Sequence, residues 1–313
     1  DGAVDASSNG GKAGSILLDP RDITIVASGA NNSSLSTTGI LFAGPPTTAN
    51  DASFSASAIQ ALNGDITLQA NRDLSINTTL TLANQSAGEA VVFQAGRNLT
   101  VRSAVTTGGA SLTFTASDAS GIADTGANSA ATATMTLLAP TTGGAVTYNN
   151  DGSGGIRLGT SIPNTGNSVT FANAVTVTAN SVVEGSAVTF SSTVNGDTAN
   201  TRSLTVNASG ATTFTGAVGT ATTGQLAALT TDEFGTTAIN GGAIKATTQT
   251  FKDDVTIGNA AGTTLTGTTV AFEKTLNSAS TTTRSITVNA SGATTFGGVV
   301  GGVDVLSGLL TDT

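Results

Sequence analysis

Hydrophobic and polar residues alternate along much of this chain in short runs, and the alternation recurs at a regular spacing. Phenylalanine marks the recurrence in the second half, at Phe171, Phe190, Phe214, Phe234, Phe251, Phe272 and Phe296. Most of these rings end a run of Val, Thr or Ala, and small or polar residues separate them from the next aliphatic residue. Alternating Val, Thr and Phe predict short strands, and the small residues predict a corner after each Phe.

A longer repeat contains this spacing. Residues 201–214 and 283–296 differ only at Leu204 and Ile286, so that Arg202 of the first copy corresponds to Arg284 of the second. A weaker echo links residues 226–232 to residues 306–312. Successive Phe residues are 17 to 24 positions apart, so about four turns would fill one 82-residue unit. Units this short cannot bury their own apolar face and must stack on their neighbours.

These patterns predict an all-β fold, a parallel β-helix (solenoid) with coils of roughly 20–25 residues. Separate β-sandwich domains of about 80 residues would also fit the long repeat, but the 20-residue spacing and the scarcity of Pro and aromatic residues favour the solenoid. We expect the Phe residues to form one internal ladder, with Phe234 its weakest member because its Thr-Asp-Glu-Phe-Gly context differs.

The same register makes a prediction about charge. Aligning Phe251 with Phe272 places Lys252 over Glu273 and Asp253 over Lys274. Opposite charges on neighbouring strands are favourable, so these two pairs are expected to help set the register.

The first half of the chain holds a second repeat family. Residues 66–76 align with residues 91–101 at an offset of 25, and each predicts a strand, an Ala-(Asn/Gly)-Arg corner and a second strand. We therefore expect β-helix coils of this second repeat family in residues 1–145, continuous with regular repeats in residues 146–313. A loop is expected to protrude near residues 27–52, and looser coils are expected over residues 118–167.

Composition limits the classes of partner. Only 10% of the 313 residues are charged, against about 25% in a typical globular domain, so hydroxyl and amide groups must provide solubility. A hydrophobic content of 38% in alternating order argues against disorder. The net charge of −9 disfavours nucleic acid and anionic membranes. No apolar run approaches the roughly 18 residues of a membrane helix, so membrane insertion is not expected.

The chain has no Cys and no His, which removes the usual catalytic triads and thiolate metal sites. Carboxylates remain, and an acidic patch comprises Asp232, Glu233, Asp253, Asp254 and Glu273. Two carboxyl groups roughly 5–9 Å apart could hydrolyse a glycoside. The neighbouring lysines favour solvated corner residues instead. We therefore expect no catalytic residue, no cofactor site, no metal site and no enzymatic activity.

Three other motifs have a chemical interpretation beside a structural one. Residues 149–155 are similar to Gly/Asp calcium loops, but the motif occurs once, which favours a turn without metal. Residues 31–34 fit an N-glycosylation acceptor pattern. The pairs Thr176/Thr178 and Thr264/Thr266 would suit a flat ice- or sugar-binding face. Thr as an ordinary strand residue is the preferred interpretation.

Residues 17–25 (Leu-Leu-Asp-Pro-Arg-Asp-Ile-Thr-Ile) and 68–76 (Leu-Gln-Ala-Asn-Arg-Asp-Leu-Ser-Ile) resemble filamentous-haemagglutinin-like exoproteins of bacteria. The Thr-Val-Asn-Ala-Ser-Gly-Ala-Thr-Thr-Phe units resemble the repeats of large surface adhesins. This resemblance implies a right-handed β-helix, secretion across the outer membrane, and an extracellular or cell-surface location.

It further implies a structural or adhesive segment of a surface exoprotein that acts in adhesion, biofilm or a surface layer. The alternative is a self-assembling extracellular filament or sheath subunit, and a polysaccharide-active β-helix enzyme is a distant third. The partners expected are copies of the chain end to end, or host or matrix glycans and proteins. Residues 1–13 and 302–313 show no capping pattern, and Leu306, Leu309 and Leu310 would leave apolar surface. This predicts either association through the ends or continuation in a longer chain.

Overall fold

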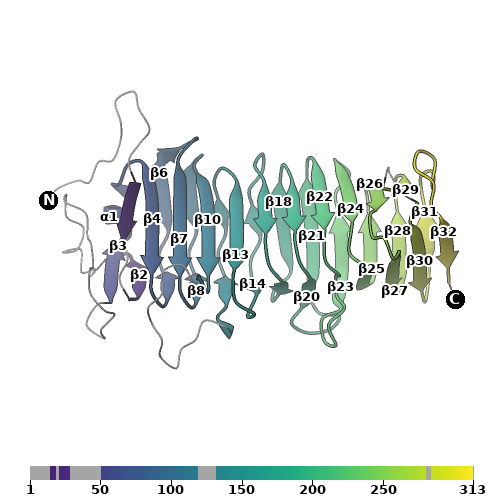
Figure 1. Ribbon diagram of the computed structural model, residues 1–313, viewed down its shortest axis with the longest axis horizontal. Coiled ribbons are helices and arrows are strands. Elements are labelled where there is room, and N and C mark those ends of the chain that lie inside the picture. Colours follow the sequence, from purple (N-terminus) through teal and green to yellow (C-terminus); the bar gives the residue numbers. More distant parts are fainter. Residues whose placement is uncertain (1–14, 19–20, 29–50, 119–131, 280–282, 313) are drawn as a thin grey trace. The chain divides into compact units, whose positions relative to one another are not determined.

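The computed structural model describes residues 15–18, 21–28, 51–118, 132–279 and 283–312. These residues are nearly all β, and their strands pair in parallel from one turn of the chain to the next, which confirms the predicted β-solenoid (Figure 1). The chain divides into two compact units, Asp1–Arg157 and Leu158–Thr313. Residues 1–13, most of the 27–52 segment and the 31–34 motif lie outside the described residues.

Unit 1 contains thirteen described strands and one short helix, and a fourteenth strand spans its boundary. The bounds are β1 (Ser15–Leu18), β2 (Ile23–Val26), β3 (Ala52–Ser55), α1 (Ala56–Gln60), β4 (Asp65–Ala70), β5 (Leu74–Ile76), β6 (Leu80–Ser86), β7 (Ala90–Ala95), β8 (Leu99–Val101), β9 (Val105–Gly108), β10 (Ser111–Ala116), β11 (Met135–Leu137), β12 (Thr141–Thr142), β13 (Val146–Asn150) and β14 (Ile156–Leu158).

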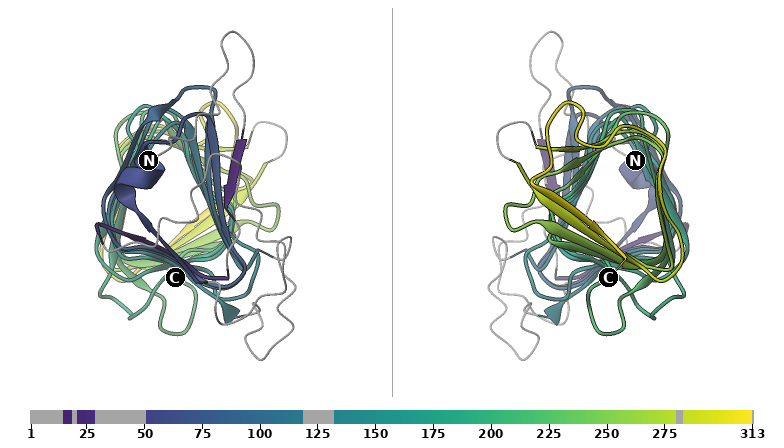
Figure 2. Two further views of the ribbon diagram at one scale, coloured as in Figure 1. Left: turned by 90° about the vertical axis from the view of Figure 1, so that its left-hand side faces the viewer. Right: turned by 90° about the vertical axis from the view of Figure 1, so that its right-hand side faces the viewer.

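Three parallel sheets form the sides of each turn in unit 1, as the end-on views show (Figure 2). One side has the strand order β1-β4-β7-β10-β13, the next β3-β2-β5-β8-β11, and the third β6-β9-β12. Ile66 lies beside Val91 of the following turn, as the repeat predicted. Alternate residues point inward, which produces the buried/partly exposed alternation of β4 and β7.

An aromatic ladder fills the interior of unit 1. Phe93, Phe114 and Tyr148 are register partners on β7, β10 and β13. Their rings stack with centroids 5.2 Å and 5.6 Å apart, and all three are fully buried. The Tyr148 hydroxyl hydrogen-bonds the Thr141 hydroxyl. Residues 135–158 thus form regular strands, where the sequence predicted looser coils.

The outer edges of two sheets in unit 1 are covered. Strand β3 pairs with β2 on the side opposite β5. Helix α1 follows at once, with Ser55 as its N-cap, and lies beside β6. Asn84 and Gln85 of β6 donate side-chain hydrogen bonds to the carbonyls of Gln60 and Leu62, at 3.1 Å and 2.7 Å. The sequence predicted no capping pattern in residues 1–13, which lie outside the described residues. The cover at this edge comes instead from β3 and α1, which the sequence analysis did not predict.

Unit 2 contains eighteen further strands. The bounds are β15 (Ile162–Pro163), β16 (Val169–Phe171), β17 (Val175–Val177), β18 (Ser181–Gly185), β19 (Val188–Phe190), β20 (Val194–Gly196), β21 (Ser203–Ala208), β22 (Ala211–Phe214), β23 (Leu226–Thr231), β24 (Thr236–Ile239), β25 (Ala243–Phe251), β26 (Asp254–Ile257), β27 (Thr263–Gly267), β28 (Thr269–Phe272), β29 (Leu276–Ser278), β30 (Ser285–Ala290), β31 (Thr294–Phe296) and β32 (Gly308–Thr311).

The strands of unit 2 also follow three sides. The first side has the order β16-β19-β22-β24-β26-β29. The second side begins with β17 and β20. It continues through Val218, which makes one bridge to Val194 and one to Ile244 at the start of β25, and then through β27, β30 and β32. The third side has β15, β18, β21, β23, the end of β25, β28 and β31. Strand β25 therefore crosses a corner and belongs to two sides.

The Phe residues form two ladders, so the prediction of one ladder was wrong. Rings 171, 190 and 214 stack on the first side, with centroids 5.0 Å and 5.3 Å apart. Rings 251, 272 and 296 stack on the third side, at 5.3 Å and 5.4 Å. Phe214 is followed in its ladder by Ile239, and Phe234 is 62% exposed. Phe234 lies in the corner before β24 and belongs to neither ladder.

The two copies of the 14-residue motif lie on different sides. In the first copy, β21 is on the third side and β22 on the first. In the second copy, β30 is on the second side and β31 on the third. Between the first strand of one copy, β21, and the first strand of the other, β30, the chain passes from side to side of the solenoid. Each step ends on one of the following: β22, Val218, β23, β24, the two parts of β25, β26, β27, β28, β29 and finally β30. The repeat thus advances by these eleven sides, one fewer than the twelve of four full turns.

Candidate functional site

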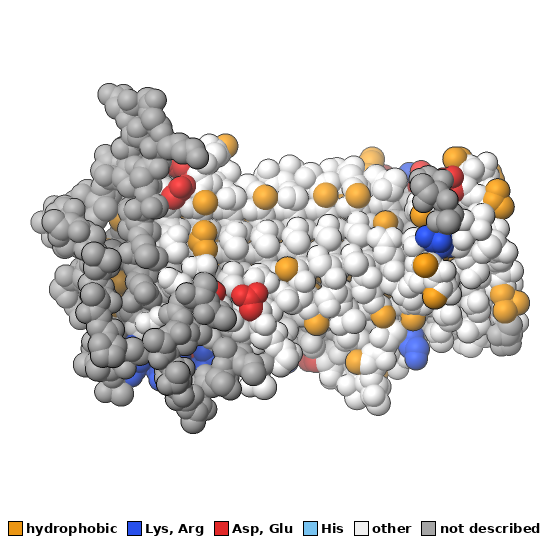
Figure 3. Space-filling model, viewed as in Figure 1, with side chains coloured by type: hydrophobic (Ala, Val, Ile, Leu, Met, Phe, Trp, Pro, Cys, Tyr) orange, Lys and Arg blue, Asp and Glu red, His pale blue; other side chains and the backbone are white. Residues whose placement is uncertain are grey.

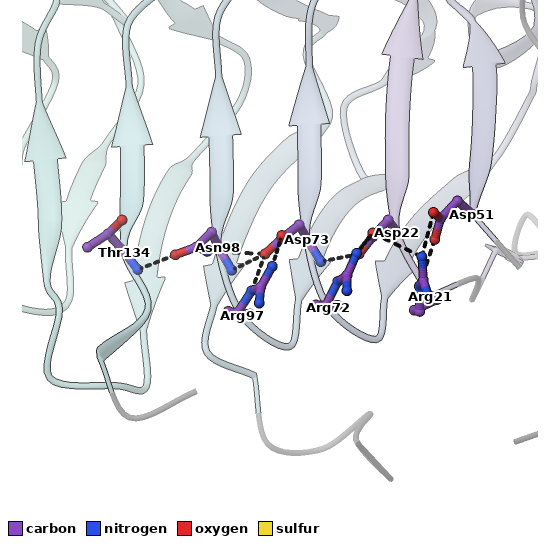
Figure 4. Close-up of polar contacts among 8 residues, drawn as sticks. All are labelled: Arg21, Asp22, Asp51, Arg72, Asp73, Arg97, Asn98 and Thr134. Atoms are coloured by element: carbon purple, nitrogen blue, oxygen red, sulfur yellow. Dashed lines mark hydrogen bonds and ion pairs between the residues drawn. The ribbon is translucent and has the colours of Figure 1, made fainter. Parts of the chain in front are cut away.

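A charged corner joins the first two sheets of unit 1 (Figure 4). The Arg-Asp or Arg-Asn pair between consecutive strands recurs at residues 21–22, 72–73 and 97–98. Arg72 and Arg97 each reach an acid one turn earlier, Asp22 and Asp73, both with Nε–Oδ1 distances of 2.8 Å. Arg21 pairs instead with Asp51, which comes just before β3. The guanidinium groups of these Arg residues are therefore all ion-paired, and they follow one another along the same corner of the solenoid.

The acids of this corner also accept backbone N–H groups from the next turn. Asp22 accepts from the N–H of Asp73, at 3.0 Å, and Asp73 accepts from the N–H of Asn98, at 3.1 Å. Asn98 continues the series by accepting from the N–H of Thr134. Burial disfavours the charged carboxylate of Asp73, but Arg97 and Asn98 outweigh this and lower its pKa. The corner therefore connects successive turns and holds its charges in fixed pairs.

We expect Arg97→Ala to reduce the free energy of unfolding by about 1 kcal/mol at pH 7, because it leaves Asp73 without its ion pair. The pKa of Asp73 is lowered in the fold. The contribution of the pair is therefore present above the unfolded pKa of about 3.9 and is lost as the pH falls through the folded pKa. Denaturant titrations at pH 7 and in acid measure this. Arg102→Ala is the control, because Arg102 is exposed; equal losses in both variants would contradict the assignment.

The three aspartates of the acidic patch of unit 2 accept hydrogen bonds from other residues. Asp232 accepts from the N–H of Ala208, and Asp254 accepts from both the N–H and the hydroxyl of Thr275. Glu233 and Glu273 are exposed. Those aspartates act as turn-to-turn hydrogen-bond acceptors, as the aspartates of unit 1 do.

Asp253 points into the solenoid. Phe251 does align with Phe272, as predicted, but Asp253 is only 1% exposed. Its carboxylate accepts from the hydroxyls of Thr231, at 2.9 Å, and Thr237, at 2.7 Å. Neither predicted charge pair, Lys252–Glu273 or Asp253–Lys274, is among the ion pairs of the described residues. The register was therefore right, and the orientation of Asp253 was wrong.

Burial raises the pKa of Asp253, and the charge of Asp232 adds to the rise, while the two Thr hydroxyls oppose it. A raised folded pKa means that the stability contributed by Asp253 is present below about pH 3.9 and is lost as the pH rises through the folded pKa. Thr212 pairs in register with Thr237. Its buried hydroxyl has no hydrogen-bond partner. The interior is thus polar at this corner.

We expect Asp253→Asn to change the pH dependence of stability. Wild type should lose stability relative to this variant as the pH rises from about 3.9 through the raised folded pKa, because only wild type must bury a charge. Asp254→Asn is the control with the opposite sign, because hydrogen bonds from Thr275 lower the pKa of Asp254. Urea titrations across this range check both, and parallel pH curves for wild type and Asp253→Asn would contradict the burial of a carboxylate.

The polar side chains of residues 149–155 that the calcium-loop interpretation would use make hydrogen bonds within or next to their own turn. Asn150 is fully buried and donates to the carbonyls of Ala133, at 3.1 Å, and Gly155, at 2.6 Å. Asn149 donates to Asp151. The described residues contain no group of three or more His, Cys, Asp or Glu arranged to hold a metal ion.

The Thr-x-Thr pairs do not extend into an array. Thr176 lies beside Asn195. Thr266 lies between Lys245 and Asn289 on the second side of unit 2. A long lysine and an amide thus interrupt the flat hydroxyl surface. Where described residues are visible in Figure 3, the face shows few charged or hydrophobic side chains and is mostly backbone and other side chains.

The same pair of backbone hydrogen bonds forms in each copy of the repeat. In the first copy, the N–H of Gly196 donates to the carbonyl of Gly224, and the N–H of Gly219 donates to the carbonyl of Val194. In the second copy, Ser278 and Asp304, and Gly301 and Leu276, make the corresponding bonds. Because the copies differ by one side, the same pair of bonds lies at two different corners of the solenoid. The sequence offset between the copies predicted a repeat but gave no signal for this rotation.

The described fold and its corners define a parallel β-solenoid whose polar side chains mainly connect one turn to the next. No protein-family model matches the chain, and no curated protein or solved structure is significantly similar to it. The single helix of the described part is too short to span a membrane.

Proposed function

We propose that the chain is a structural and adhesive segment of a secreted bacterial surface exoprotein, located outside the cell or on its surface. The observation that supports this is the rotation of the repeat. Equivalent hydrogen-bonded corners lie at different positions around the solenoid, so the repeat presents the same corner in more than one direction. A shaft that displays weak contacts in several directions suits adhesion, biofilm or surface-layer roles, with host or matrix glycans or proteins as partners.

The distribution of polar groups supports the same proposal. The aspartates at the corners accept hydrogen bonds from the next turn, and the Arg residues at 21, 72 and 97 are paired. These groups hold the turns together, and no enzymatic activity is proposed for them. The strand–Arg-Asp corner–strand pattern is also the part of the sequence that resembles haemagglutinin-like exoproteins.

The test duplicates one repeat unit, residues 215–296, after Phe296. Eleven further sides add three and two-thirds turns, or about 18 Å at roughly 4.8 Å per turn. We expect electron microscopy to show discrete particles longer by this amount, and beads coated with the duplicated chain to bind matrix or glycan surfaces more strongly. The same segment in scrambled order is the control. Binding equal to that of uncoated beads would contradict an adhesive role.

A filament or sheath subunit is the second candidate. Apolar side chains are exposed near β32, including Val303 at 83%, Val305 at 62% and Leu310 at 51%. Such surface favours association between subunits. Ordered polymers in the same micrographs would support this candidate over the shaft.

A further inference from the structure

The interior of unit 2 contains a carboxyl group whose charge is not compensated. Among the described residues of this unit, Asp253 is the only buried one with an ionisable side chain, at 1% exposure. It takes part in none of the ion pairs of the described residues. Buried charges in proteins are usually paired or bind metal ions, because an isolated one is costly. An ionised Asp253 therefore calls for a positive charge.

The groups that contact this carboxylate are hydroxyls from two neighbouring strands. Thr231 of β23 donates to Oδ1 at 2.9 Å, and Thr237 of β24 donates to Oδ2 at 2.7 Å. Both threonines are fully buried. A hydroxyl that donates its proton keeps lone pairs that can bind a cation. The corner thus presents hard oxygen ligands to the interior, together with one negative charge.

A third hydroxyl lies beside these two. Thr212 of β22 pairs in register with Thr237, and both residues occupy inward positions of their strands. The Thr212 side chain is fully buried, and its hydroxyl has no hydrogen-bond partner. Most buried hydroxyls in proteins have a partner, so an exception calls for an explanation. A ligand bound between Thr212, Thr237 and Asp253 would give this hydroxyl a partner.

The charge of the corner indicates the chemical class of that ligand. A water molecule would satisfy the Thr212 hydroxyl but would leave the Asp253 carboxylate uncompensated. Calcium takes six to eight oxygen ligands, typically with several carboxylates, whereas this interior corner supplies one. Asp232 lies close enough to act on Asp253 by its charge, which strengthens the attraction for a cation. Its own carboxylate is only partly buried and accepts from the N–H of Ala208. One buried negative charge matches a monovalent cation.

We propose that the Asp253 corner binds a sodium ion, with the Asp253 carboxylate and the hydroxyls of Thr212 and Thr237 among its ligands. Thr231 holds the carboxylate in place by its hydrogen bond. The close spacing of these oxygens favours sodium over the larger potassium ion. The ion joins β22, β24 and the corner before β26, which are successive strands of the first side. It would stabilise the solenoid whether or not the chain is adhesive.

Hydrogen exchange in β24 and β26 tests this on the unmodified chain. The comparison is between sodium chloride and choline chloride at equal ionic strength and about pH 8, where a carboxylate is normally ionised. A ligand that binds only the closed state protects it by a factor of 1 + [L]/Kd. Sodium at about ten times its Kd should therefore slow exchange about ten-fold. Equal exchange in the two salts across a sodium titration would overturn the proposal. Stronger protection by potassium or calcium than by sodium would overturn the assignment of the ion.

Two variants connect the sodium effect to these side chains. Asp253→Asn keeps the shape of the side chain and removes its charge, so the response to sodium should disappear. Thr212→Val should weaken the response at least several-fold, because it removes one ligand. The matched control is Thr213→Val, which changes the adjacent, partly exposed residue of the same strand and should keep the full response.

Thr212→Val also distinguishes the ion from a simple packing defect. Without an ion, loss of an unpartnered buried hydroxyl should be neutral or stabilising at every sodium concentration. With the ion, the variant should lose protection relative to wild type only in sodium chloride. A wild-type sodium response in Thr212→Val would overturn the proposal, and this comparison decides the matter even if Asp253→Asn does not fold.

Discussion

Replacing Phe190 by Ala should destabilise the protein by about 3–5 kcal/mol, the largest loss expected of a single truncation. Phe190 is the middle ring of the first-side ladder, with Phe171 at 5.0 Å and Phe214 at 5.3 Å, and all three are fully buried. The substitution removes the ring from both contacts and leaves a cavity that the fixed register of the strands cannot close. Denaturant unfolding followed by circular dichroism measures the loss.

The matched control is Phe234→Ala, which removes the same atoms from a side chain that is 62% exposed. Its effect should stay within about 0.5 kcal/mol. Hydrogen exchange should also rise in β16, β19 and β22 in the Phe190 variant alone, because each turn of a solenoid is stabilised by its neighbours. Similar losses for the two variants would show that the ladder is not the core of unit 2.

Gly235→Ala should be the second large effect, with a loss of at least about 2 kcal/mol. Gly235 has φ of +73°, and a Cβ there would collide with the carbonyl oxygen of Gly210. The obstacle is the backbone of the preceding turn, which is itself hydrogen-bonded because the N–H of Thr236 donates to that carbonyl. The variant must therefore separate two turns or abandon the corner. Unfolding titrations give the magnitude.

Gly88→Ala separates the cost of a positive φ from the cost of the steric collision. Gly88 also has a positive φ, +97°, but nothing lies within 4 Å of a Cβ at that position. Its loss should be near the conformational cost of about 1 kcal/mol. If Gly235→Ala lowered the free energy of unfolding no more than Gly88→Ala, the close approach of Gly235 to the backbone of Gly210 would be contradicted.

The fold class followed from the sequence because strand alternation and turn length are local properties. The pairing of Ile66 with Val91 and of Phe251 with Phe272 was predicted from simple offsets. The single ladder failed because the number of sides between two Phe residues depends on how the corners are made. Strand β25 passes from one side to the next without a break, and Phe234 lies in a corner. Residue spacing alone does not distinguish eleven sides from twelve.

The sequence pattern also could not predict which way the side chains at corners point. Asp253 and Asp254 are adjacent and chemically identical, yet one is buried against Thr231 and Thr237 and the other bonds Thr275. At a corner the alternation of a strand stops, so the pattern does not say which residue points inward. The Arg–Asp line of unit 1 had a usable signal, an Arg followed by Asp or Asn at the same place in successive turns, but the partner one turn earlier follows only from the stacked turns.

The two-ladder arrangement is tested most directly by proton–proton contacts between rings and methyl groups in solution. In a chain labelled at Phe rings and Ile methyl groups, the first-side ladder predicts nuclear Overhauser contacts between the Phe214 ring and the Ile239 methyl, because these residues pair in register. It also predicts contacts among Phe251, Phe272 and Phe296, and none from Phe214 to Phe234. Contacts that run from Phe214 through Phe234 to Phe251 would restore a single ladder and contradict the eleven-side repeat.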